Sequence, residues 1–117
     1  MAKRRQKRQE RRPPATAEYR DEQGNVLVLR QSLTAGTVRK IRRQGGSEAA
    51  SVDDVWRRRS ELLFERLAVR WEISGVQTEG QKALLMRYRV ASPDERRFVR
   101  DTLREHLAEH FPDMEAP

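Results

Sequence analysis

Positive charge gathers at one end of this chain, and that end has almost nothing to bury. Seven of the first twelve residues are Lys or Arg and one is acidic, so they carry +6 of the formal net charge of +7. The segment runs into a proline pair, Pro13-Pro14. Because the cost of ordering a segment must be offset by burial, we predict that residues 1–16 form a disordered basic arm. The fold must then come from residues 17–117, which we expect to form a single small domain.

The remainder of the chain is almost neutral. Its 105 residues hold 18 Lys and Arg and 17 Asp and Glu, and over the whole chain charged residues (37%) match apolar ones (36%). Such a composition favours a thin core and strongly amphipathic helices. The absence of cysteine excludes disulfides and thiolate chemistry, and no apolar run approaches the length of a membrane span or a secretory signal. We therefore expect a cytoplasmic protein that does not associate with membranes.

Turn and cap signals predict a β-hairpin at the start of the folded part. Two short extended runs, one opening at Tyr19 and the other covering Val26–Leu29, flank Asp21–Asn25, in which a Gly-Asn pair tolerates positive φ. The second run is apolar without alternation, which indicates that both of its faces are covered.

Cap signals divide the remainder of the chain into four helices. The first is capped by Ser32 or Thr34 and reaches about Arg43, and the second and longest covers about Val52–Ser74 and ends at Gly75. A capping-box pattern at Thr78–Gln81 begins a third helix, which reaches about Val90. The fourth begins at Ser92-Pro93-Asp94-Glu95 and reaches His110. The predicted fold class is α-rich (α+β), an N-terminal β-hairpin followed by about four helices, with the basic arm disordered.

The longest predicted helix presents two apolar arcs. At 100° per residue one arc holds both tryptophans, Trp56 and Trp71, which favours it as the internal core. The second arc holds Val55, Leu62, Val69 and Ile73 and is flanked by a row of arginines, Arg59, Arg66 and Arg70. Either the helix lies at the centre of its own domain, or this second arc and its arginines meet a second copy or another protein.

The two histidines, His106 and His110, form an H-x-x-E-H pattern that resembles the inverted zinc-protease signature. Only seven residues follow His110, so the further ligand of that family is lacking, and both imidazoles share a helix face with apolar residues. We predict packing histidines, with a divalent-metal pair as the alternative. No phosphate-binding glycine loop or nucleophile elbow occurs, so we expect no enzyme activity and no cofactor.

The basic arm suits contact with nucleic acid phosphates. Its Lys and Arg residues are interleaved with Gln and include no aromatic residue that could stack on a base, which favours non-specific, salt-dependent binding. A second basic run, Arg39–Arg43, could extend the surface that contacts phosphates. The alternatives to nucleic acid contact are that the arm is a solubilising tail, or that it binds an acidic protein or an acidic lipid. The candidate nucleic-acid-binding residues are Lys3, Arg4, Arg5, Lys7, Arg8, Arg11, Arg12, Arg39, Lys40, Arg42 and Arg43.

Residues 18–75 also resemble small tail assembly chaperones of long-tailed bacteriophages. The resemblance lies in a short hairpin (Glu18 to Leu29), a short helix entered through Leu33-Thr34, and an apolar helix ending in Leu63–Glu72. It implies a non-catalytic helical protein that binds tape-measure or tail-tube subunits and self-associates. In that alternative function the basic arm is incidental.

Overall fold

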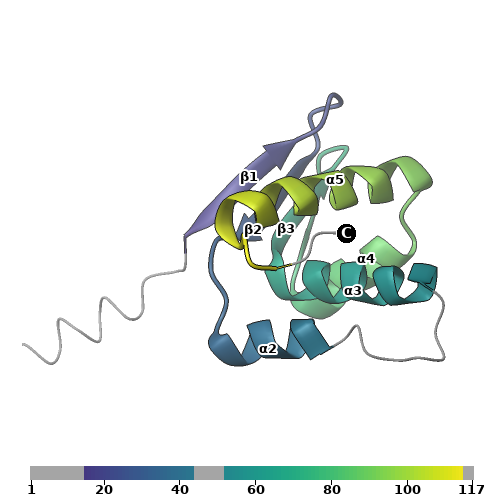
Figure 1. Cartoon of the computed structure of the whole chain (residues 1–117). Helices are drawn as coiled ribbons and strands as arrows, with labels where there is room; N and C mark the ends of the chain where they lie inside the picture. Colours follow the sequence, from purple (N-terminus) through teal and green to yellow (C-terminus); the bar gives the residue numbers. More distant parts are fainter. Residues whose placement is uncertain (1–14, 44–51, 115–117) are drawn as a thin grey trace, which may run out of the picture.

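The computed structural model describes residues 15–43 and 52–114. Over this part of the chain four strands form one antiparallel sheet in the order β1-β2-β3-β4, accompanied by four helices (Figure 1). In chain order the elements are β1 (Thr16–Arg20), β2 (Val26–Arg30), α2 (Ala35–Arg43), α3 (Val52–Leu67), β3 (Ala68–Ile73), β4 (Val76–Glu79), α4 (Gln81–Arg89) and α5 (Pro93–His110). Of the predicted disordered arm, residues 1–16, residues 1–14 lie outside the described residues, and Thr16 is the first residue of β1.

The predicted β-hairpin is confirmed. β1 and β2 pair antiparallel, with Tyr19 opposite Leu27, around a turn that Asp21 organises. The carboxylate of Asp21 accepts hydrogen bonds from the backbone N–H groups of Gln23 and Asn25, both at 2.9 Å. Gly24 adopts a φ of 82°, a conformation that favours glycine.

The predicted fold class is wrong, because the sequence predicted to form one long helix forms a helix and a strand. α3 ends at Leu67 and the chain continues directly as β3, which pairs with β2 and with β4. Ser74 and Gly75, predicted to end a helix, instead form the two-residue turn between β3 and β4, with φ values of 51° and 79°. Positive φ at both central residues matches the twist of a tight hairpin. The protein is therefore a mixed α+β fold.

Two side chains explain why residues 68–73 are stable as a strand. Trp71 is opposite Leu27 in the register and is buried in the core, whereas Arg70 is opposite Val28 and forms an ion pair with Glu18 of β1 at 3.5 Å. Ile73 packs against the core as Trp71 does, and this spacing of two residues is the period of a strand. A strand here adds a partner to β2, whose backbone groups would otherwise remain exposed at a sheet edge.

Arg30 stabilises the point where α3 becomes β3. Its guanidinium Nη1 donates hydrogen bonds to the carbonyl oxygens of Arg66 and Ala68, at 3.2 and 3.1 Å. The last carbonyls of a helix lack partners within the helix, and neither Gly nor Pro ends this one. The strand pairing is irregular next to this point, between Val28 and Leu29. One arginine from β2 thus satisfies the carbonyls that the transition releases.

The helix-start predictions have mixed outcomes. The capping box at Thr78–Gln81 is wrong: Thr78 lies in β4, and α4 begins after Gly80, which makes no side-chain cap. The capping box of α5 is confirmed, since Ser92 Oγ accepts from the Glu95 N–H at 3.1 Å and Glu95 Oε1 accepts from the Ser92 N–H at 2.8 Å. The hydrogen bond from the Ser92 backbone N–H to the Glu95 carboxylate holds the pKa of Glu95 below its ordinary value.

Both faces of strand β2 are covered, one of them by helices. Figure 1 shows α5 and α3 on the same side of β2 and β3, with α2 beside α3. Leu27 and Leu29 of β2 belong to the core on the helix side, whereas Val26 and Val28 are buried outside that core cluster. All four apolar residues of β2 are buried, so the prediction that both of its faces are covered is confirmed.

Candidate nucleic-acid interface

Helix α2 separates its apolar and cationic residues onto opposite faces. Ile41 is completely buried and Val38 packs against the core. At 100° per residue the four cationic residues occupy an arc of about 160° centred opposite Ile41, and all four are exposed. We call this surface the α2 basic face; its residues are Arg39, Lys40, Arg42 and Arg43.

No carboxylate of the described side chains pairs with the α2 basic face. The sequence of α2, AGTVRKIRR, contains no acidic residue. Among the described side chains, those of residues 15–43 and 55–114, none pairs with any of its four cations, whereas Arg87 pairs with Glu95 at 2.9 Å and Arg89 with Glu61 at 3.3 Å. With respect to the described side chains, the face therefore presents four exposed charges without a carboxylate partner.

Hydrogen bonds fix the attachment point of the basic arm close to the start of α2. The backbone N–H of Gln31 donates to the Ala15 carbonyl at 2.9 Å, and its side-chain Nε2 donates to the Thr16 carbonyl at 3.2 Å. Three residues after Gln31, the hydroxyl of Thr34 accepts from the Thr37 N–H at 3.2 Å and so caps α2, as predicted. Both predicted basic segments are therefore joined to the same end of the fold.

The structure does not bring the predicted protein-interface residues onto one helical arc. Val55, Arg59, Leu62 and Arg66 lie on α3, and Val69, Arg70 and Ile73 lie on β3. Leu62 is buried within the core and Ile73 packs against it. The geometric basis of that prediction, a continuous helix, is therefore wrong; self-association itself stays a prediction.

A polar cleft of about 540 Å³ lies next to the start of α2, and no sequence motif marks it. It is bounded by the loop before α2, by the junction of α3 with β3, and by the start of α4. Its charged lining residues are Arg30, Glu65 and Arg66, and Thr34 and Thr37 also line it. The Arg30 guanidinium is engaged by the junction carbonyls, and the lining of the cleft carries both signs of charge. Thr37 of α2 and Thr34, which caps this helix, lie on the side of the helix opposite the α2 basic face.

His106 is a structural hydrogen-bonding residue. Its ring is completely buried, with Nε2 2.7 Å from the Arg30 carbonyl and Nδ1 2.7 Å from the Tyr19 hydroxyl. A carbonyl only accepts, so Nε2 carries the proton and Nδ1 accepts from Tyr19. Burial lowers the pKa of His106, which favours this neutral form. The prediction of a packing histidine is confirmed, and α5 is thereby tied to β1 and β2.

The neighbouring His110 does not complete a metal site in the described part of the chain. Its ring centroid lies 4.7 Å from that of His106, and its Nε2 is 3.8 Å from a carboxylate oxygen of Glu109. Both nitrogens of His106 are already engaged by protein groups. Among residues 15–43 and 52–114, no three His, Cys, Asp or Glu residues are grouped so that they could hold a metal ion.

Comparison with protein-family models, with curated proteins and with solved structures finds no match to this chain. The resemblance to tail assembly chaperones therefore stays a prediction. Among the helices that the structure describes, none has the length and apolar character needed to cross a bilayer.

Proposed function

We propose that this protein binds nucleic acid through its phosphate groups, using the α2 basic face together with the basic arm, and that it catalyses no reaction. The observation that carries the proposal is the exposed, acid-free α2 basic face, which no carboxylate of the described residues pairs with. Phosphate contacts of this kind give sequence-independent affinity, typically with Kd of about 10⁻⁴–10⁻⁶ M at physiological salt.

The attachment of α2 to the core supports this function. Ile41 is buried and Val38 packs against the core, so the helix holds its outward cations at fixed spacing. Pre-positioned cations lose less conformational freedom on binding than cations on a free chain. The arm, which joins the fold beside Gln31, adds seven Lys and Arg side chains that can make further phosphate contacts.

A purely structural role accounts for the α2 cations only in part. Cations near a helix C-terminus interact favourably with the helix dipole, by about 0.3–1 kcal/mol each, and Lys40, Arg42 and Arg43 lie in the last turn. The interaction with the helix dipole explains why cations are favourable at this end of α2, but it does not explain why α2 contains no acidic residue. It also does not extend to Arg39, which precedes the last turn.

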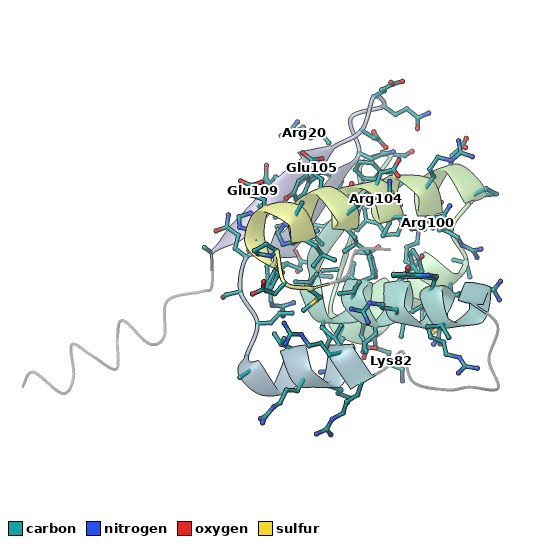
Figure 2. All side chains as sticks on the ribbon, in the orientation of Figure 1. Arg20, Lys82, Arg100, Arg104, Glu105 and Glu109 are labelled. Atoms are coloured by element: carbon teal, nitrogen blue, oxygen red, sulfur yellow. The ribbon has the colours of Figure 1, made fainter. Side chains whose placement is uncertain are left out.

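The experiment compares salt dependence of duplex binding between two variants of equal charge. Arg39→Gln/Arg42→Gln removes two cations from the α2 basic face, and Arg97→Gln/Arg100→Gln removes two exposed cations from α5. Figure 2 labels Arg100 on α5, which α3 separates from α2. Fluorescence anisotropy with a 20-base-pair duplex gives the slope of log affinity against log salt concentration.

Each lost phosphate contact reduces the steepness of that slope by about 0.9. We therefore expect the α2 variant to lose about 1.8 from the slope and the α5 variant to keep the slope of the unmodified chain. Deletion of residues 1–12 should reduce the slope further. Equal slopes for the two variants would show that only net charge matters and would contradict the proposed interface.

A further inference from the structure

The aromatic residues of this chain are withdrawn from its surface. The sequence contains seven aromatic residues, and all of them fall within the described ranges. None is exposed: Phe64, Trp71 and Tyr88 are buried, and Tyr19, Trp56, Phe98 and Phe111 are half-buried. Because residues 1–14, 44–51 and 115–117 include no aromatic residue, this statement covers the whole sequence.

Several of these rings are occupied by other protein groups. Phe64 stacks on Tyr88 with centroids 5.0 Å apart and meets Trp71 edge-on at 5.5 Å. The Arg59 guanidinium lies 5.9 Å from the centroid of the half-buried Trp56 ring. Tyr19, Phe98 and Phe111 pack against the core. Helix α2 itself contains no aromatic residue, so the α2 basic face carries no ring of its own to stack on a base.

This distribution bears on which form of nucleic acid the protein can bind. Proteins that hold single strands combine a cationic groove with aromatic side chains, and each stacked base contributes substantially to affinity. The α2 basic face offers charge alone. A helix of nine residues is about 13.5 Å long, a length over which a duplex presents about eight phosphate charges and one stacked strand at most about four.

We infer that the protein selects duplex over single-stranded nucleic acid by charge density. This inference rests on the proposed phosphate-binding function and adds to it the form of the partner. The recognised chemistry is the doubled phosphate backbone, which DNA and RNA duplexes share. Bases held inside a duplex need no aromatic partner, so the lack of a stacking surface carries no cost for duplex binding.

The experiment measures the affinity of the full chain for four probes of the same mixed sequence. These are a 20-base-pair DNA duplex, a 20-base-pair RNA duplex, and the two corresponding 20-nucleotide single strands. We expect each duplex to bind at least about tenfold more tightly than its single strand at 0.1 M salt. A duplex preference in only one of the two series would assign the partner to DNA or to RNA.

A matched pair of variants tests the physical cause. Lys40→Trp and Lys40→Gln lose the same charge at an exposed position, but only the first adds a ring to the α2 basic face. We expect Lys40→Trp to bind single strands at least about fivefold more tightly than Lys40→Gln, with equal duplex affinities, because one stacked base contributes about 1–3 kcal/mol.

The outcomes separate this inference from the proposed function. Single strands that bind as tightly as duplexes would overturn the inference and leave phosphate binding intact. A chain that binds none of the four probes would overturn the proposed function, and this inference with it.

Discussion

Replacing Tyr19 by Phe tests the hydrogen bonds that tie α5 to the sheet. The change removes the hydroxyl that donates to His106 Nδ1 at 2.7 Å and leaves a ring nitrogen in a completely buried imidazole without its partner. An unsatisfied buried acceptor costs about 1–3 kcal/mol. Tyr19 is half-buried and water can approach it, so the lower part of that range applies, about 1–2 kcal/mol.

A loss of this size is readily measured in a small domain. For a fold of roughly 100 residues each kcal/mol lowers Tm by about 4–8 °C, so Tyr19→Phe should lower Tm by roughly 4–16 °C. Thermal unfolding followed by circular dichroism gives the value.

Tyr88→Phe is the matched control, because within the described residues the Tyr88 hydroxyl makes no hydrogen bond. We expect that variant to unfold within about 2 °C of the unmodified chain. Equal Tm values for the two variants would refute the role assigned to the Tyr19–His106 pair.

Three further predictions follow from the described contacts. Burial lowers the pKa of His106 below the ordinary value of 6.5, so at lower pH the unfolded chain binds a proton that the folded chain does not. The contribution of His106 to stability should therefore be complete above pH 6.5 and decrease as the pH falls. If His106→Leu shows the same dependence of Tm on pH as the unmodified chain, this prediction is contradicted. Stoichiometric zinc should leave Tm unchanged, since both His106 nitrogens are engaged; a zinc-dependent rise abolished by His110→Ala would contradict the structural interpretation. Ser92→Ala should cost about 1 kcal/mol in chemical denaturation, and an unchanged midpoint would show that the capping box contributes nothing.

Local sequence signals correctly predicted two features of the fold, the N-terminal hairpin and the start of α5. Both depend on residues close in sequence, Gly24 in the turn and Ser92 with Glu95 in the capping box, whose interactions form within the segment itself. The buried state of Val26 to Leu29 followed from the absence of alternation in an apolar run.

The transition from α3 to β3 could not be located from the same signals. Leu67 and Ala68 are both compatible with a helix, and neither Gly nor Pro separates the two elements. The carbonyls released there are satisfied by Arg30, which lies 36 positions before Arg66 in the chain. Gly75 was also ambiguous, because a glycine after a periodic run fits a helix end as well as a hairpin turn.

The candidate interface was predictable in composition but not in shape. The run Arg39–Arg43 was identified as basic from sequence. Its exposure as one face depends on the burial of Ile41 against distant residues. The proximity of the arm to α2 depends on the pairing of Gln31 with Ala15, which a sequence pattern does not reveal.

The most direct test of the central claim is an NMR titration of the full chain with a 20-base-pair duplex. If the α2 basic face and the arm bind phosphates, the largest amide shift changes should fall in residues 1–14 and 35–43 and should disappear at high salt. The exposed face of α5, which carries Arg97 and Arg100, should change little. Shift changes concentrated on α5 or on the sheet face of Glu18 and Arg70, with α2 unaffected, would contradict the account.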